Sequence, residues 1–411
     1  MSFSTDADLV IVGGGPAGLS TALFFEHAAP RLRERVLVLE RGRYPREKVC
    51  AGAIGARADR LLASIGVRVD VPSVPMFGLS VSTRGGKLVR RRDTGPPIGR
   101  VVRRVEFDHA LAEQARAAGL RVHDGVSVSS ISIDAKNGVS LETSAGRVRA
   151  AAIVGADGVG SIVRRSLGLP KGAFLAKALE IDTERVATDA PADLLSFDLS
   201  ACGLAGYAWD FPTLVAGRSM VCRGIYELSA EGVPARAPDQ EEPGARLVSR
   251  ASRLGLSVEA SKLKRFAERG LSLNEPFAAP RVLLVGEAAG IDPALGEGIA
   301  QAIHYGALAG PFLAAALQKG DLSFASFPEV LRKSRLGLDL LLRGRAARYV
   351  YGRTRPLVES WVTSSSALAG AGMSYFAGER VARLGLVRAG FDLGRAYIAE
   401  KVTSLRSAAS P

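Results

Sequence analysis

Two short apolar runs near the start of the chain have the pattern of buried parallel strands. The first covers residues 9–12 and leads through a glycine-rich turn into an apolar helical pattern over 19–25, and the second covers 36–39. Strands covered by helices on both faces have continuous hydrophobic runs of this kind. The pattern predicts an α/β fold whose ligand binds at the carboxyl ends of the strands.

Alternating apolar and polar positions mark the middle of the chain. A hairpin is predicted over 79–89 around a turn at 84–87, and a surface loop rich in Pro and Glu over 231–243 precedes a predicted helix over 244–254. Further short strands are predicted over 174–180, 194–199, 207–212 and 219–226. We expect these strands to form an antiparallel sheet inserted into the α/β unit.

The turn after the first run has the glycine spacing of a dinucleotide-binding loop. Gly13 permits a tight turn, Gly15 lets a pyrophosphate approach the backbone, and Gly18 lets helix and strand pack closely. Pro16 and Ala17 then begin the helix, whose free N–H groups favour an anion. Because such loops also occur as ordinary turns, this motif alone does not separate FAD from NAD.

Glu40 ends the second run and follows Gly18 by twenty-two residues. Its carboxylate can accept hydrogen bonds from both ribose hydroxyls of an adenosine, and it would repel a 2′-phosphate. The position therefore disfavours NADP, and we expect Glu40 and the adjacent Arg41 to contact the cofactor.

Two later segments predict that the dinucleotide is FAD. One apolar run ends at residues 155–158, and another, over 281–285, delivers a carboxylate and leads to a glycine-rich helix start at 296–299 that can hold flavin or phosphate oxygens on free N–H groups. Each segment alone could be a buried strand with a glycine turn, but their order together favours a flavin. The expected cofactor contacts are Asp157, Gly158, Gly286, Glu287, Pro293, Gly296, Gly298 and Ile299.

From about residue 6 to 320 the chain resembles the geranylgeranyl reductase family of FAD-dependent oxidoreductases, which has the p-hydroxybenzoate hydroxylase fold. Residues 44–52 are similar to the family's Lys-x-Cys-(Gly/Ala)-Gly stretch beside the flavin, 206–212 to its Tyr-x-Trp-x-Phe-Pro substrate motif, and 104–108 to an Arg-x-x-Phe-Asp helix start near the cofactor. The resemblance implies that Cys50, Ala51 and Arg104 contact FAD. It also implies that Glu287, where the family usually has Asp, contacts the ribityl chain.

The aromatic residues Tyr207, Trp209 and Phe211 are the first catalytic candidates. At strand spacing they share one face, and aromatic faces stabilise the positive charge that develops on carbon when an unactivated alkene is reduced. Cys50 is the second candidate, as a proton donor, a substrate-shaping group or a redox-sensitive thiol. The alternatives are an ordinary core stripe and a buried, inert cysteine.

The leading hypothesis is an FAD-dependent reductase of prenyl-chain double bonds in a lipid, quinone or other isoprenoid bound in an apolar tunnel. The alternative is an FAD monooxygenase or halogenase of an aromatic or polyketide-like metabolite, and a third class is a flavoprotein that only carries electrons at a membrane surface. Halogenases of this fold carry a catalytic Lys and a Trp-x-Trp-x-Ile-Pro-like stretch, which residues 207–212 do not match. Because no second dinucleotide motif exists, electrons are expected from transiently bound NADPH, a ferredoxin or another donor.

Composition predicts a large cytoplasmic enzyme of more than one domain. The chain has 411 residues, 47% of them hydrophobic. Its cysteines, Cys50, Cys202 and Cys222, have no metal-ligand spacing and suit a reducing compartment. No signal peptide is apparent, and no apolar stretch long enough to span a membrane is expected.

The net charge of +13 is concentrated near the C-terminus, because residues 331–411 contain fourteen Lys and Arg against five Asp and Glu. On a helix, Arg380, Arg383 and Arg388 would fall within an arc of roughly 140°, with Trp361, Tyr375, Phe376 and Arg343 in the same region. Two interpretations stay open: a peripheral helix on anionic lipid, or a solvated basic face. No recognition motif supports nucleic-acid binding.

Since the three cofactor segments must reach one FAD, the predicted FAD-binding domain is Rossmann-like and discontinuous. It comprises residues 1–75, 100–170 and 275–330, the substrate domain comprises 76–99 and 171–274, and 331–411 form a helical basic region.

Overall fold

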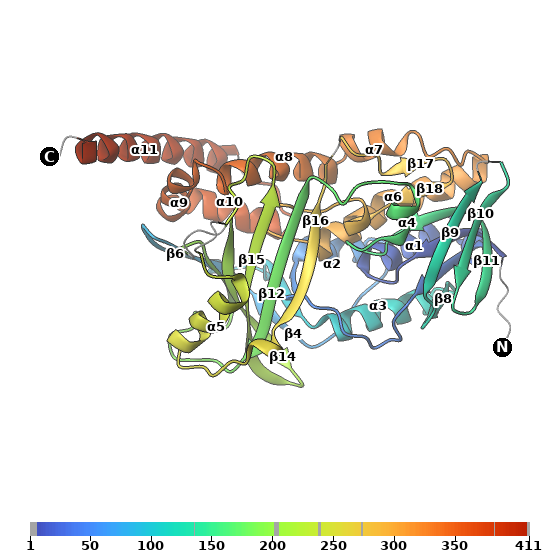
Figure 1. Ribbon diagram of the computed structural model, residues 1–411, viewed down its shortest axis with the longest axis horizontal. Helices are drawn as coiled ribbons and strands as arrows, with labels where there is room; N and C mark the ends of the chain where they lie inside the picture. Colours follow the sequence, from blue (N-terminus) through green and yellow to red (C-terminus); the bar gives the residue numbers. More distant parts are fainter. Residues whose placement is uncertain are drawn as a thin grey trace.

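A computed structural model of the chain describes residues 6–134, 136–200, 205–236, 240–272, 274–381 and 383–408. Its long axis runs from a sheet near the N-terminus to the last helix, α11 (Arg383–Ala408), which extends beyond the body at the opposite end (Figure 1). Cys202 and Ala382 lie outside the described residues.

The first sheet is the predicted α/β core. Its strand order is β17-β18-β11-β1-β2-β8, parallel from β18 to β8, with β10 and β9 continuing from β11 as an antiparallel meander. Ile11 in the central strand lies opposite Val154 on one side and Val38 on the other. The strands are β1 (Asp6–Val12), β2 (Val36–Glu40), β8 (Arg121–Asp124), β9 (Val128–Asp134), β10 (Gly138–Thr143), β11 (Gly146–Gly155), β17 (Ala278–Ala279) and β18 (Val282–Leu284).

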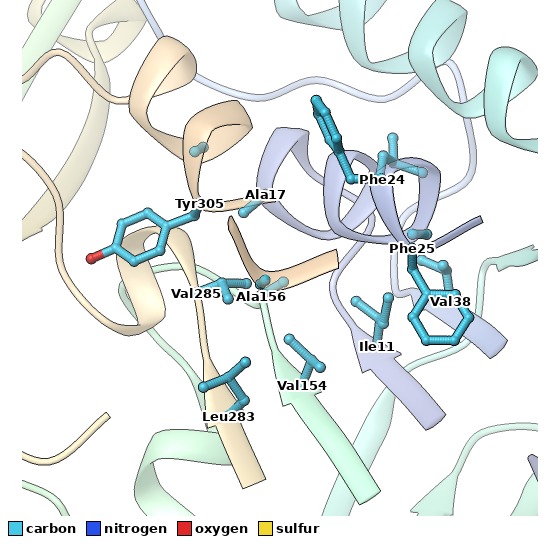
Figure 2. Packing of buried hydrophobic residues seen from close by; sticks show 14 of the residues in the cluster. Ile11, Ala17, Phe24, Phe25, Val38, Val154, Ala156, Leu283, Val285 and Tyr305 are labelled. Carbon is cyan, nitrogen blue, oxygen red and sulfur yellow. The ribbon is translucent and has the colours of Figure 1, made fainter. Parts of the chain in front are cut away.

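Two helices, α1 (Pro16–Ala28) and α6 (Ile299–Lys319), pack against each other over this sheet. Figure 2 shows the α1 side chains and Tyr305 of α6 around the strand residues of the core. Gly306 permits the close approach, because a Cβ on it would lie 2.1 Å from Ser20 Oγ.

The expectation that no apolar stretch could span a membrane was wrong. By length and composition α6 could do so, but 67% of its apolar window is buried inside the protein. Its apolar character is explained by packing in the core.

The second sheet has seven strands in the order β16-β12-β15-β14-β13-β5-β6. Each strand predicted in the inserted region is present, and all neighbours are antiparallel except β13 and β5, which are parallel. Helix α5 (Pro243–Arg253) packs on β12 and β15. The strands are β5 (Gly78–Thr83), β6 (Gly86–Arg91), β12 (Phe174–Thr183), β13 (Leu194–Asp198), β14 (Gly206–Val215), β15 (Arg218–Ala230) and β16 (Lys264–Gly270).

A small third sheet, β3-β7-β4, is antiparallel. Its strands contact β14 of the second sheet and helix α6. Its strands are β3 (Ala53–Gly55), β4 (Ser73–Met76) and β7 (Gly99–Val102). The remaining helices before the C-terminal region are α2 (Ala56–Ala63), α3 (Arg104–Ala117), α4 (Ile162–Ser166), and the 3-10 turns η1 (Pro30–Arg35), η2 (Ala260–Lys262) and η3 (Gly286–Ala288).

The C-terminal region is helical, and it packs along the second sheet, where α9 and α10 contact β5 and β6. Because α10 ends at Phe376 and α11 begins at Arg383, Arg380 lies in the connection between them. The prediction that Arg380, Arg383 and Arg388 share one helix was therefore wrong. The helices are α7 (Phe327–Lys333), α8 (Arg335–Val350), α9 (Arg355–Ser364), α10 (Ser366–Phe376) and α11.

Candidate active site

The three glycine-rich segments meet at the carboxyl ends of β1, β11 and β18, and they form one wall of a cleft of about 430 Å³. Gly13 has φ +109°, and its N–H donates to the Leu39 carbonyl at 2.8 Å. A Cβ on Gly18 would lie 1.9 Å from the Gly13 carbonyl oxygen. The tight turn and the close packing of helix on strand therefore have the predicted geometry.

Most of the predicted cofactor residues line this glycine-rich cleft. Four do not: Gly18 packs on Gly13, Gly286 on Ala17, and Pro293 on Gly270, while Ala51 lines a neighbouring cavity. The predicted residues that line the cleft are Gly13, Gly15, Pro16, Ala17, Glu40, Arg41, Cys50, Arg104, Asp157, Gly158, Glu287, Gly296, Gly298 and Ile299.

Glu40 is fixed at the end of β2 by two backbone donors. The Gly14 N–H donates to its Oε2 at 2.8 Å and the Gly42 N–H to its Oε1 at 2.9 Å. Arg46 lies 3.1 Å from the same carboxylate through Nε and 3.1 Å from buried Asp108 through Nη1. Sequence reasoning gave Arg46 no role, because nothing in its own segment reveals that two carboxylates hold it over the cleft.

Gly15 faces the open cleft beside two positive charges. A Cβ placed on it would meet no atom closer than Nη2 of Arg104 and Nη2 of Arg46, both at 3.9 Å. Arg104 is itself held by a bidentate ion pair with Asp108, at 2.6 and 2.7 Å. A pyrophosphate at this turn would therefore find free space, the N-terminus of α1 and two guanidinium groups.

Asp157 supports the opposite side of the cleft. Its Oδ2 accepts hydrogen bonds from the N–H groups of Ile162 and Val163 at the start of α4, and Ser161 caps that helix. The buried Oδ1 has no hydrogen-bond partner among the described residues. Burial raises the pKa of Asp157. An acceptor without a partner, on a residue that lines the glycine-rich cleft, fits a ligand that carries hydroxyl groups, as FAD does.

A second cavity, of about 410 Å³ and mostly apolar, lies beside the cleft. Tyr207, Trp209 and Phe211 of β14 all line it, so the prediction that they share one face is confirmed. Phe197 of β13 contacts this aromatic row, with ring centroids 5.2 Å from Phe211 and 5.6 Å from Tyr207. Gly224 on β15 leaves room for the Trp209 indole, because a Cβ there would lie 2.0 Å from it.

Three tyrosine hydroxyls around this apolar cavity are turned to the backbone. Tyr226, Tyr351 and Tyr207 donate to the carbonyls of Pro293, Ala294 and Leu295, respectively. Burial raises the pKa of each of the three hydroxyls. The hydroxyls are thus engaged, and Tyr207 and Tyr226 present their rings to the cavity.

The C-terminal region supplies another wall of the apolar cavity, which the sequence did not predict. Tyr375 and Phe376 of α10 line it, whereas the sequence suggested a role for them only as interfacial aromatics, in one of the two open interpretations. Arg343 of α8 is also a lining residue, and it is paired with Asp292, Glu297 and Asp339. These carboxylates raise the pKa of Arg343. The expectation that Arg343 belongs to an exposed basic face was wrong.

The cleft and the apolar cavity share a wall. Six residues line both: Cys50, Phe266, Glu268, Gly296, Gly298 and Ile299. The Cys50 N–H donates to Glu180 Oε1 at 3.1 Å, and burial raises the pKa of the Cys50 thiol. The site therefore favours a neutral thiol over a reactive thiolate. The sequence did not single out Glu268 as a site residue. Its place at the shared wall follows from the position of β16 in the second sheet.

Comparison with known proteins identifies relatives of this chain. Residues 6–323 match the family described as FAD binding domain. A digeranylgeranylglycerophospholipid reductase of Methanothermobacter thermautotrophicus is 30% identical over 356 residues, covering 81% of this chain and 85% of that protein. A menaquinone reductase of Mycobacterium tuberculosis is 26% identical over 324 residues, covering 76% and 78%.

Among solved structures, a geranylgeranyl bacteriochlorophyll reductase-like protein of Thermoplasma acidophilum superposes with a TM-score of 0.73 at 22% identity. The match covers 93% of this chain and 95% of that one. At this level of identity the likeness shows a shared fold.

Proposed function

Because this chain belongs to the geranylgeranyl reductase family of FAD-dependent oxidoreductases, we propose that it reduces carbon–carbon double bonds in the prenyl chain of a lipid, a quinone or a related isoprenoid. The observation that carries the proposal is the wall shared by the glycine-rich cleft and the apolar cavity. A ligand bound in the apolar cavity would meet a cofactor in the cleft at that wall.

FAD is the cofactor of this enzyme, and when reduced it supplies a hydride to one alkene carbon. Gly15, Arg46 and Arg104 would hold its pyrophosphate, and Glu40 its adenosine ribose. Glu287 and the start of α6 at Ile299 would lie beside the flavin end. These assignments follow from which side chains line the cleft and from the charges they carry.

The aromatic row would receive the substrate. The rings of Tyr207, Trp209 and Phe211 line the cavity, and aromatic π faces attract the positive charge that develops on carbon during alkene reduction. The apolar lining also disfavours water beside the reacting double bond. The chain's residues thus bind, orient and shield the substrate.

The substrate of such an enzyme resides in a membrane, and α11 offers a surface for reaching it. Ala389 and Ala396 are buried, and the Trp361 indole donates to the Ala389 carbonyl at 2.8 Å, so one face of α11 packs on the body. The opposite face exposes Leu384, Val387, Phe391 and Ile398, which at about 100° per residue lie within an arc of about 60°.

Positive charges flank this apolar stripe of α11, defined by Leu384, Val387, Phe391 and Ile398. Arg388 and Arg395 are exposed along one edge of the stripe and Arg383 along the other. Exposed apolar residues flanked by arginines suit the interface of an anionic bilayer. We therefore propose a cytoplasmic enzyme that sits peripherally on a membrane through α11.

The electron donor is proposed to be NADPH, a ferredoxin or another reductant. A direct test of the reaction avoids the donor by reducing the flavin with light. The holoenzyme is photoreduced without oxygen and mixed with a digeranylgeranyl glycerophospholipid or with menaquinone in detergent micelles. Reoxidation of the flavin at a rate that depends on substrate concentration supports the proposal. Reoxidation only when oxygen is admitted with an aromatic compound, with a C4a-hydroperoxide spectrum, would favour the monooxygenase.

A further inference from the structure

The alkene that gains a hydride on one carbon must gain a proton on the other, and the donor of that proton has to lie at the shared wall. Resting on the proposed function, we infer that Glu268 is this donor: its carboxyl O–H bond breaks, a C–H bond forms, and the π bond of the alkene is lost. The two electrons that reduce the alkene arrive with the hydride and form one C–H bond, while the former π electrons form the bond to the proton. The carboxylate left on Glu268 takes a proton from solvent after product release.

Geometry places Glu268 where both ligands would meet. It lies on β16, two residues after Phe266, and both side chains line the cleft and the apolar cavity. Only 8% of Glu268 is exposed, and its Oε2 has no hydrogen-bond partner among the described residues. A Cβ on Gly296 would lie 2.7 Å from Oε2, so the carboxyl packs closely against this glycine, which itself lines both spaces.

The surroundings of Glu268 favour its protonated form. Burial, together with the nearby carboxylates Glu287 and Asp292, raises the pKa of Glu268 well above its usual range, while Lys48 acts in the opposite direction. A carboxyl held neutral at neutral pH can donate a proton as a general acid. The titratable or charged groups that face it are Lys48, Cys50, Glu180, Tyr207, Tyr226, Glu287 and Asp292.

The other acids near the apolar cavity are less suited. The hydroxyls of Tyr207, Tyr226 and Tyr351 donate to backbone carbonyls. Glu180 accepts from the Cys50 N–H but does not line either cavity. Cys50 is the one rival among the residues of the shared wall, since its thiol is also protonated and also lines both spaces.

The aromatic row and Glu268 act on the same carbon framework. Proton donation from Glu268 would develop positive charge on the more substituted alkene carbon, and the rings of Trp209 and Phe211 line the same cavity as the carboxyl. The Glu268 carboxyl and the aromatic rings can therefore both stabilise the transition state in which the alkene is protonated.

The test uses Glu268→Gln, which keeps the shape and neutrality of the protonated side chain but cannot act as the acid. With photoreduced holoenzyme and a digeranylgeranyl glycerophospholipid, we expect single-turnover flavin reoxidation to slow by about 100-fold or more. FAD content and reoxidation by oxygen should stay at the wild-type level. Glu227→Gln is the matched control, because Glu227 pairs with Arg236 and lines neither cavity.

The pH profile distinguishes proton donation from a structural role. The wild-type rate should fall as the pH rises through the raised pKa of Glu268, because the carboxyl then loses the proton that it donates. Glu268→Gln should lack this alkaline limb.

Three results would overturn the inference. If wild type reduces the lipid and Glu268→Gln is equally fast, or if Cys50→Ala alone abolishes the alkaline limb, Glu268 is not the donor. If wild type reduces no prenyl substrate, the proposed function fails and the assignment of Glu268 fails with it.

Discussion

Two glycines of the same turn, Gly15 and Gly18, should respond in opposite ways to an added side chain. Gly15 precedes α1 with φ −82° and ψ −176°, a conformation open to any residue. A Cβ there points into the cleft, with no atom closer than 3.9 Å. A Cβ on Gly18 would instead lie 1.9 Å from the Gly13 carbonyl oxygen, well inside van der Waals contact.

The magnitudes follow from these contacts. In Gly15→Val the loss of a glycine N-cap costs about 1 kcal/mol or less, and the reduced freedom of the unfolded chain returns about 0.4–1 kcal/mol. The free energy of unfolding should therefore stay within about 1 kcal/mol of wild type. The valine side chain would occupy the pyrophosphate position, and we expect at least about a 100-fold loss of FAD affinity, or about 2.7 kcal/mol.

Gly18→Ala should do the reverse. The methyl group can be accommodated only if α1 moves away from β1, and overpacking of this kind costs about 1–3 kcal/mol or more. The assays are the flavin absorbance of the purified proteins, FAD titration of the apoproteins by fluorescence quenching, and urea unfolding followed by circular dichroism. A Gly15→Val protein with full flavin would refute the placement of the pyrophosphate at this turn, and a Gly18→Ala protein of wild-type stability would refute the close packing of α1 on β1.

Three further predictions test other parts of the protein. Trp209→Leu keeps an apolar side chain but removes the ring, so turnover of a prenyl lipid should fall by about tenfold while FAD content stays unchanged. A tenfold fall corresponds to a cation–π contribution of about 1.4 kcal/mol. Normal turnover would show that this strand has no role in substrate binding. Arg343→Gln removes the cation that pairs with Asp292, Glu297 and Asp339, of which only the last two also contact Arg57, and it should lower the free energy of unfolding by about 3–5 kcal/mol. Replacing exposed Arg345 by Gln should change the free energy of unfolding by less than about 0.5 kcal/mol, and equal urea midpoints for the two variants would contradict this. Phe391→Ser combined with Ile398→Ser should reduce cosedimentation with anionic liposomes at low salt without affecting reduction of a detergent-dispersed substrate, and unchanged liposome binding would show that α11 is not the contact.

The sequence was sufficient to predict the cofactor cleft because its signals are local. Gly13 needs a positive φ, Gly18 needs the close approach of helix to strand, and Glu40 ends the second strand, twenty-two residues after Gly18. Parallel strands bring their carboxyl ends to one edge, so Asp157 and Glu287 could be expected at the same cleft before any contact was known. The alternation in β14 likewise predicted which aromatic rings share a face.

What the sequence did not predict depends on contacts between distant segments. Arg343 belongs to a run of leucines and arginines that is typical of an exposed amphipathic helix, yet it pairs with Asp292 and Glu297 and so lies at the apolar cavity. The guanidinium groups of Arg57 and Arg343 lie over the Tyr375 ring, 4.9 and 4.6 Å from its centroid. These partners lie on α2, on α8 and before α6, and no local pattern connects them.

The central claim is that this enzyme adds hydrogen to a prenyl double bond without using oxygen. The most direct measurement is mass spectrometry of the product formed by the photoreduced holoenzyme from a digeranylgeranyl glycerophospholipid, once under argon and once under isotopically labelled oxygen. We expect the same product in both atmospheres, with two added hydrogen atoms for each reduced double bond and no label. A product formed only under oxygen and carrying the labelled atom would contradict it.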